Sequence, residues 1–350
     1  MKGLQTKITN NFKLEVIKDV IKKEEKKEEI KDIYFNLVYK DNKYKVWYSS
    51  NRELDEIYRM NDVTINNKYK LRMYGNIEST LLSGKEINNI YEEEETFKYI
   101  RSKTVLKSNI QKCIRRGLDS EAIISSFALI KMDFLSFIRR IIVIAIEDVG
   151  IPDNLDVLVW LMVSYPNYVL TNDIINMLLN LVYNLCKHTD IMLYNSNSDY
   201  DVIDGMNEQY FNTNYITGLT IRKHFGGLKG DLEMIDNYIH HLLNNKEINI
   251  IKVKNRNLLI KRDMVRKDII LESIDFHCYP DLIYSIYNEI NRKISSNQIK
   301  ILIWEKSSKT NIRKNDIIDC YEEENNRDWN IIKDIVKRYQ YNYRQNLKLY

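Results

Sequence analysis

The feature that most constrains this 350-residue chain is a nearly continuous apolar run over residues 134–151. Its apolar residues would cover every side of a helix, which is typical of a helix buried among other helices. Four charges interrupt the run, at Arg139, Arg140, Glu147 and Asp148, and they argue against a membrane span. Buried charges need partners. We therefore expect an arginine to pair with Glu147 or Asp148.

The residues that lead into this run also follow a helical pattern. Arg115 and Arg116 suit the last turn of a helix, and Gly117 suits a left-handed residue that ends it. Asp119 or Ser120 is then expected to cap the next helix. That helix should break near residues 131–133, before the apolar run begins. The arginines expected to pair with Glu147 or Asp148 are Arg115, Arg116, Arg139 and Arg140.

Helical periodicity dominates the chain from residue 96 onward. One exception is the segment 247–261, which could form a hairpin across residues 254–257. The further helices that we expect lie between Pro152 and Pro166 and over residues 172–187, 215–224, 231–244, 280–295 and 328–345.

The first part of the chain has a different composition. Residues 12–32 predict a solvated Lys/Glu helix, and residues 33–50 alternate as a β-hairpin around a turn at 40–43. A further strand is expected over 68–75. The acidic cluster 92–95 marks a boundary. The predicted fold class is therefore mainly α, with a small N-terminal α/β module (1–95) followed by a helical domain (96–350).

Composition narrows the class of protein further. The net charge of +4 does not by itself indicate a polyanion partner, and the 4 cysteines form no CxxC pair, which suits a reducing compartment. The N-terminus shows no apolar leader. We expect an intracellular protein, located in the cytoplasm or in a viral replication factory, that needs no cofactor. Asn, Ile, Lys and Tyr residues are frequent. Because their codons are rich in A and T, we expect an AT-rich genome, such as that of a virus, a plasmid or a low-GC microbe.

Two stretches, IQKCIRRGLDSEAI and FIRRIIVIAIEDVGIPD, lie within residues 105–153. Together they resemble the helical region that follows the ATPase core in the replication-associated recombination AAA+ ATPases (the MgsA/RarA/WRNIP group). The resemblance covers about fifty residues and rests on Arg115, Arg116, Gly117, Arg139, Arg140, Glu147, Asp148 and Gly150. It implies a helical domain like a clamp-loader collar, homo-oligomerisation, association with DNA, and an AAA+ ATPase or other replication protein as partner.

The ATPase motor of that family has no counterpart in this sequence. A phosphate-binding loop requires GxxxxGK[ST]. The nearest segment, STLLSGKE at 79–86, has Ser79 where the first glycine belongs and Glu86 where the Mg²⁺ ligand belongs. The resemblance therefore implies a stand-alone helical module from a virus or mobile element.

A basic run near residue 260 is the predicted nucleic-acid contact, because cations on an exposed edge can meet phosphates. The alternative is ordinary surface charge. The residues of this run are Lys252, Lys254, Arg256, Lys261, Arg262, Arg266 and Lys267.

Two further patterns admit a ligand. The glycine-rich segment 224–231 could expose amides to an anion, or it could be a tight turn with Asp231 as the N-cap of the next helix. A metal site is the second possibility, since carboxylates and imidazoles are the ligands of two-metal hydrolases. Its candidate ligands are Asp231, Asp236, His240, Asp275 and His277.

Taken together, these patterns predict a non-catalytic, oligomerising and DNA-binding helical adaptor in replication, recombination or repair. Two alternatives stay open. A metal-dependent hydrolase or nuclease requires the carboxylates and imidazoles to converge in one pocket. A structural interaction protein of a large virus requires a large apolar contact surface.

Overall fold

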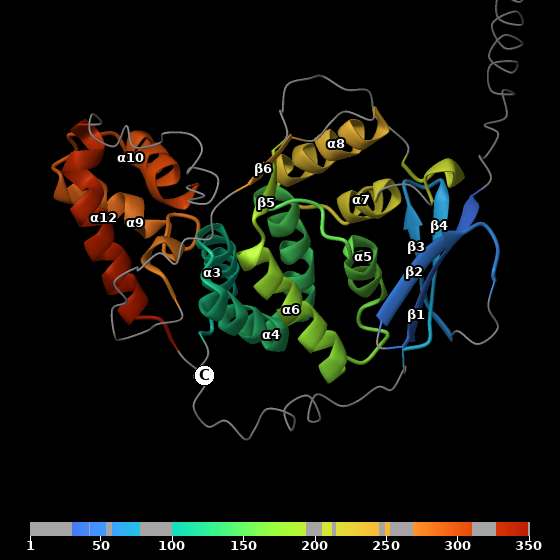
Figure 1. The fold of residues 1–350 in the computed structure, drawn as a ribbon. Helices are drawn as coiled ribbons and strands as arrows, with labels where there is room; N and C mark the ends of the chain where they lie inside the picture. The colour runs from blue at the N-terminus through green and yellow to red at the C-terminus, as the bar shows by residue number, and fades with distance from the viewer. Residues whose placement is uncertain are drawn as a thin grey trace, which may run out of the picture.

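The computed structural model describes residues 30–41, 43–53, 58–77, 100–193, 205–211, 215–244, 249–252, 269–309 and 327–348. Within them the protein is mainly α-helical, with a small sheet near the N-terminus. Figure 1 shows the sheet at one end of the molecule, a C-terminal group of helices at the other end, and the remaining helices between them. No helix in these ranges is both long and apolar enough to cross a membrane.

The sheet contains the predicted hairpin, β1 (Lys31–Lys40) and β2 (Lys43–Ser49), which pair antiparallel as expected. It also contains the predicted strand β4 (Tyr69–Gly75) and a strand that the sequence analysis missed, β3 (Tyr58–Ile65). The order is β2-β1-β4-β3, with β1 and β4 parallel. The Lys/Glu segment 12–32 lies outside the described residues except for its last three positions, and so does the predicted boundary near residue 95.

One side of the sheet packs on α5 (Leu155–Ser164), the helix predicted between the two prolines. The indole of Trp160 donates hydrogen bonds to the carbonyls of Phe35 (3.2 Å) and Tyr74 (3.1 Å). A Cβ on Gly75 would lie 2.7 Å from the Trp160 ring, so the absence of a side chain there lets the ring reach the sheet. Sheet and helices therefore share a single apolar core.

The motif helices are α3 (Lys103–Arg116) and α4 (Asp119–Asp148). Gly117 has φ 67° and ends α3 as predicted, and α4 breaks at Asp133, which has φ −163°. The predicted cap of α4 was wrong: Leu118 occupies the N-cap position without a side-chain hydrogen bond, and Asp119 instead pairs with Lys187 at 3.0 Å.

Three more predicted helices surround α4. They are α6 (Asn172–Lys187), α7 (Ile216–His224) and α8 (Lys229–Leu243). Because α8 begins before Asp231 and has Leu228 as its N-cap, the interpretation of Asp231 as a cap was also wrong. The structure adds a short turn, η1 (Glu208–Tyr210).

The arm of the hairpin expected at 247–261 has a different partner. Residues Asn249–Lys252 form β6, which pairs antiparallel with β5 (Asp190–Leu193). The other arm of the expected hairpin lies outside the described residues.

The C-terminal group contains η2 (Leu271–Ser273), α9 (Asp281–Glu289), α10 (Ser296–Ile303), the π-turn η3 (Trp304–Ser308) and α12 (Arg327–Gln345). Helix α12 matches the predicted segment 328–345. Helix α9 lies in the predicted segment 280–295 but ends at Glu289, before Asn291 and Arg292, which have positive φ. Helix α10 and η3 were not predicted. Helices α9, α10 and α12 enclose a second apolar cluster, separate from the first. Between the two clusters lies a polar layer that α3 shares with residues 269–279 and 307–308.

Candidate functional site: a basic cleft beside α3

A cleft of about 530 Å³ opens between α3, α4, the start of α8, residues 275–278 and η3. We call it the basic cleft, because six cationic side chains line it against three carboxylates. Its charged lining residues are Lys107, Lys112, Arg115, Arg139, Arg140 and Arg222, with Glu147, Asp231 and Asp275.

One face of α3 supplies the floor of the cleft. Lys107, Gln111 and Arg115 are four residues apart, so their side chains lie above one another on the helix. Arg115 joins three parts of the molecule. It donates from Nε to Asp148 (2.8 Å), from Nη2 to Glu147 (2.7 Å) and from Nη1 to the carbonyl of Ser308 (2.8 Å). The predicted pairing of an arginine with Glu147 and Asp148 is therefore present, and Arg115 makes it.

The other motif arginine of α3 is also held inside the fold. Arg116 is 4% exposed and donates to the carbonyls of Lys112 (3.1 Å) and Ser307 (3.4 Å). Burial lowers the pKa of its guanidinium. Because the side chains of Arg115 and Arg116 are both buried and engaged, the geometry favours a role in stabilising the fold over contact with a phosphate.

Gln111 and Arg140 continue the network across the cleft. Gln111 donates to Glu147 (2.8 Å) and Asp148 (3.1 Å) and accepts from Arg140, which also pairs with Asp231 at 3.4 Å. Burial, followed by the charge of Asp148, raises the pKa of Glu147.

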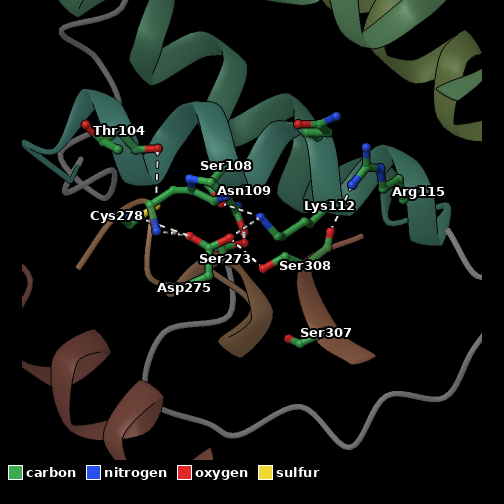
Figure 2. Close-up of polar contacts among 12 residues, drawn as sticks. Thr104, Ser108, Asn109, Lys112, Arg115, Ser273, Asp275, Cys278, Ser307 and Ser308 are labelled. Carbon is green, nitrogen blue, oxygen red and sulfur yellow. Dashed lines mark hydrogen bonds and ion pairs between the residues drawn. The ribbon is translucent and has the colours of Figure 1, made fainter. Parts of the chain in front are cut away.

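A buried ion pair closes the end of the cleft next to the C-terminal helices (Figure 2). Lys112 Nζ lies 2.9 Å from Asp275 Oδ2, and their side chains are 7% and 1% exposed. Ser308 Oγ donates to the same oxygen at 2.7 Å, and the amides of His277 and Cys278 donate to Oδ1. Burial alone would raise the pKa of Asp275, but Lys112 and these donors outweigh it and lower the pKa.

The neighbouring thiol and imidazole are not activated for nucleophilic chemistry. Burial, together with the charge of Asp275, raises the pKa of Cys278 to about 11. Burial also lowers the pKa of His277, whose ring lies tilted against that of Phe276 and meets Trp304 edge-on at 5.7 Å. A thiol protonated at neutral pH is a poor nucleophile. His277 and Trp304 therefore contribute aromatic surface to the lining of the cleft.

Two arginines fix the glycine-rich turn at the opposite end of the cleft. Arg139 donates to the carbonyl of Phe225 at 2.6 Å, and Arg222 donates to the carbonyls of Gly226 (2.8 Å) and Arg139 (3.0 Å). The carbonyls of Phe225 and Gly226 thus face arginines, which favours the tight turn among the two expected alternatives. Burial, and then the charge of Arg139, lower the pKa of Arg222 to about 10.

The charges in the basic cleft do not balance. Lys112, Arg115 and Arg140 each have a carboxylate partner. Lys107, Arg139 and Arg222 have none among the residues that the structure describes. In addition, Arg222 Nε is buried and has no hydrogen-bond partner there. The cleft therefore holds excess positive charge and one unused buried donor.

The candidate metal ligands are not brought together. Asp231 pairs with Arg140, Asp236 with Lys223 (2.5 Å) and Asp275 with Lys112, so each carboxylate already faces a cation. His240 is buried on α8, and His277 lies against rings on the far side of the cleft. Within the described ranges, no three His, Cys, Asp or Glu side chains are placed to hold a metal ion. The convergence required for a two-metal hydrolase is thus not observed.

Most of the predicted nucleic-acid contact lies outside the described residues. Only the backbone of Lys252 is described, at the end of β6. The residues outside are Lys254, Arg256, Lys261, Arg262, Arg266 and Lys267.

Lys107, Lys112 and Arg222 were not predicted from the sequence to lie in a site. The four-residue spacing of Lys107, Gln111 and Arg115 was a signal for a polar face on α3. No local pattern pointed to Arg222, because its position beside Arg139 depends on how α7 packs against α4.

Comparison with protein family models, with curated proteins and with solved structures finds no match to this chain. The geometry and charge of the basic cleft are therefore the basis for assigning a function.

Proposed function

We propose that this protein is a non-catalytic helical adaptor that binds the phosphate backbone of DNA, acting in replication or recombination. The observation that carries the proposal is the excess positive charge of the basic cleft. Lys107, Arg139 and Arg222 line it without a carboxylate partner among the described residues. Non-specific binding to DNA depends mainly on such cations, because each neutralised phosphate releases condensed counterions.

The state of Arg222 argues for an anion in particular. A buried guanidinium beside another guanidinium is unfavourable unless an anion approaches. A phosphate held in the cleft would oppose, through its charge, the repulsion between Arg222 and Arg139. The aromatic surfaces of His277 and Trp304 on the far wall would suit an unstacked base.

The resemblance of residues 105–153 supports the cellular context of the proposal. Those residues make up α3, α4 and the turn after them, and α3 and α4 contribute the floor and one wall of the basic cleft. By analogy with the recombination ATPases, the helical part would work as a collar-like module. It would form homo-oligomers and act beside an AAA+ ATPase or another replication protein.

The test is binding of the purified chain to fluorescent single- and double-stranded DNA across a salt series. Lys107→Gln is the informative variant, because Lys107 makes no ion pair with any residue that the structure describes. We expect weaker binding and a salt slope that falls by about 1. Lys45→Gln on β2, an exposed lysine outside the cleft, is the matched control and should bind as the wild type does.

A second variant set tests the basic run near residue 260. Neutralising Lys252, Lys254, Arg256, Lys261 and Arg262 should reduce the salt slope further if both regions contact the same strand. Absence of DNA binding by the wild type at low salt would overturn the proposal. Hydrolysis on addition of a divalent metal would favour the metal-dependent enzyme instead, and self-assembly without DNA binding would favour a structural protein.

A further inference from the structure

A second, larger cleft of about 980 Å³ lies on another part of the molecule, away from the basic cleft. Its walls are α6, the segment 149–154 that follows α4, the β1–β2 turn and β5. Helix α6 packs on α4 and leads into β5 (Figure 1). We call this site the asparagine cleft, because Asn176, Asn180 and Asn184 of α6 all line it.

The three asparagines form one column along α6. They are four residues apart and exposed, so their side chains share a helix face. None of the three side-chain amides makes a hydrogen bond to another residue in the described parts of the chain. Each amide offers one acceptor and two donor hydrogens. The column is thus a row of unused paired donors and acceptors.

The spacing of this column matches an extended polypeptide. Residues four apart on an α-helix rise about 6 Å along the axis. An extended chain repeats every two residues, or about 6.6 Å, and presents the N–H and C=O of alternate residues on one edge. Over two intervals the two repeats differ by little more than 1 Å, which side-chain torsions can absorb. A peptide lying along α6 would therefore offer one N–H and C=O pair to each asparagine.

The charged residues around the column indicate which side chains the bound peptide would carry. Asp153, Asp173 and Asp190 line the asparagine cleft and make no ion pair with any described residue. Two lysines, Lys43 and Lys187, also line the cleft. Lys187 is already paired with Asp119 at 3.0 Å, so Lys43 alone is left to balance the three aspartates. The rim therefore carries excess negative charge and attracts cationic side chains.

We propose that the asparagine cleft binds an extended, lysine- or arginine-containing segment of a partner protein. The amides of Asn176, Asn180 and Asn184 bond to alternate peptide groups of that segment, and the three aspartates pair with its basic side chains. This site shares no lining residue with the basic cleft. The inference therefore stands independently of DNA binding.

The test uses the full chain and a fluorescein-labelled nonapeptide of alternating lysine and threonine, with fluorescence anisotropy as the readout. One control peptide has glutamate in place of lysine. A second control is the lysine peptide N-methylated at alternate backbone nitrogens, which keeps the charge but removes the donors facing the column. The protein variants are Asn180→Ala, the triple variant Asn176→Ala/Asn180→Ala/Asn184→Ala, and Asn330→Ala on α12 as the matched control.

We expect the wild type to bind the lysine peptide and to bind both control peptides at least tenfold more weakly. Asn180→Ala should weaken binding about three- to tenfold, the range for the loss of one neutral hydrogen-bonding partner. The triple variant should lose most of the affinity and all sensitivity to N-methylation, and Asn330→Ala should change nothing. Alanine is the best helix former, so α6 stays folded, and the melting temperature of each variant checks this.

Three results would overturn the proposal. They are failure of the wild type to bind the lysine peptide at millimolar concentration, equal binding of the N-methylated peptide, and unchanged affinity of the triple variant. The last two would show that the cleft attracts cations without reading the peptide backbone.

Discussion

Lys112 and Asp275 illustrate how a buried ion pair can hold two parts of the molecule together. They are 163 positions apart in the chain, and their contact joins α3 to the segment that leads into α9. Both side chains are almost fully buried, so removing one charge would leave the other without a partner in the interior. The pair therefore makes the docking of the C-terminal helices sensitive to a single substitution.

We predict that Asp275→Asn destabilises the protein by about 3 kcal/mol at neutral pH, because it leaves Lys112 buried and unpaired. The pKa of Asp275 is lowered in the folded state. As the pH falls, the Asp275 carboxylate is therefore protonated in the unfolded chain before it is protonated in the folded protein. The stabilisation by the ion pair is then lost as the pH falls below 3.8, the ordinary pKa of an aspartate. The stability difference between wild type and Asp275→Asn should shrink below about pH 4.

Urea unfolding at a series of pH values measures this difference. The double variant Lys112→Met/Asp275→Asn is the control, and it should lose less stability than the two single variants added together. A difference that stays constant from pH 7 to pH 3 would contradict the assignment of the pH dependence to Asp275.

Helix α4 shows how one side chain can divide a long helix. Asp133 leaves the helical conformation, and its carboxylate accepts from the amide (3.0 Å) and hydroxyl (2.9 Å) of Ser136. It also pairs with Lys103 at 2.6 Å. Asp133 thus caps the second half of α4, which carries the buried apolar run, and it ties this cap to the first turn of α3.

We predict that Asp133→Ala lowers the free energy of unfolding by about 1 kcal/mol, the typical cost of removing an N-cap. Asp133→Asn keeps the capping oxygen and should cost less, since asparagine caps about as well as aspartate. Denaturant unfolding of both variants is the measurement. Equal losses for Asp133→Ala and Asp133→Asn would mean that the charge pair with Lys103, not the cap, supplies the stability.

The described residues form two apolar cores, which are joined by polar contacts of α3 and by Tyr279 and Tyr343, whose rings pack on both cores. The sheet and α3–α8 share the larger core, and α9, α10 and α12 form the smaller one. Contacts between these parts include hydrogen bonds of Asn109 to Ser273 (2.7 Å) and to the amide of Ile270 (3.1 Å). A boundary rich in polar contacts gives less hydrophobic stabilisation than a continuous core. We therefore expect the C-terminal helices to unfold as a separate unit.

We predict that α9, α10 and α12 open before the rest of the molecule, so that native-state hydrogen exchange in α12 is faster than in α4. Ile332→Ala in the smaller core should cost about 3 kcal/mol and speed exchange in these helices alone. Leu37→Ala, in β1, is the matched control and should speed exchange in the sheet. Equal protection of α4 and α12 in the wild type would show that the two cores unfold together.

Apolar spacing and turn residues were enough to predict much of the local structure. The β1–β2 hairpin, α6, the end of α3 at Gly117 and the break in α4 all follow from dihedral preferences and side-chain periodicity, which act over a few residues. The need of buried charges for partners predicted the pairing of an arginine with Glu147 and Asp148. Each of these features depends on residues close together in the chain or on the packing of α3 against α4.

Tertiary packing decided the rest. The strand β6 pairs with β5, Lys112 meets Asp275, and Arg222 lies beside Arg139. Such contacts join residues tens to hundreds of positions apart, and no local preference encodes them. The excess charge of the basic cleft is of this kind: it is the balance of side chains from α3, α4, α7, α8 and the C-terminal segment, and it exists only once those elements are assembled.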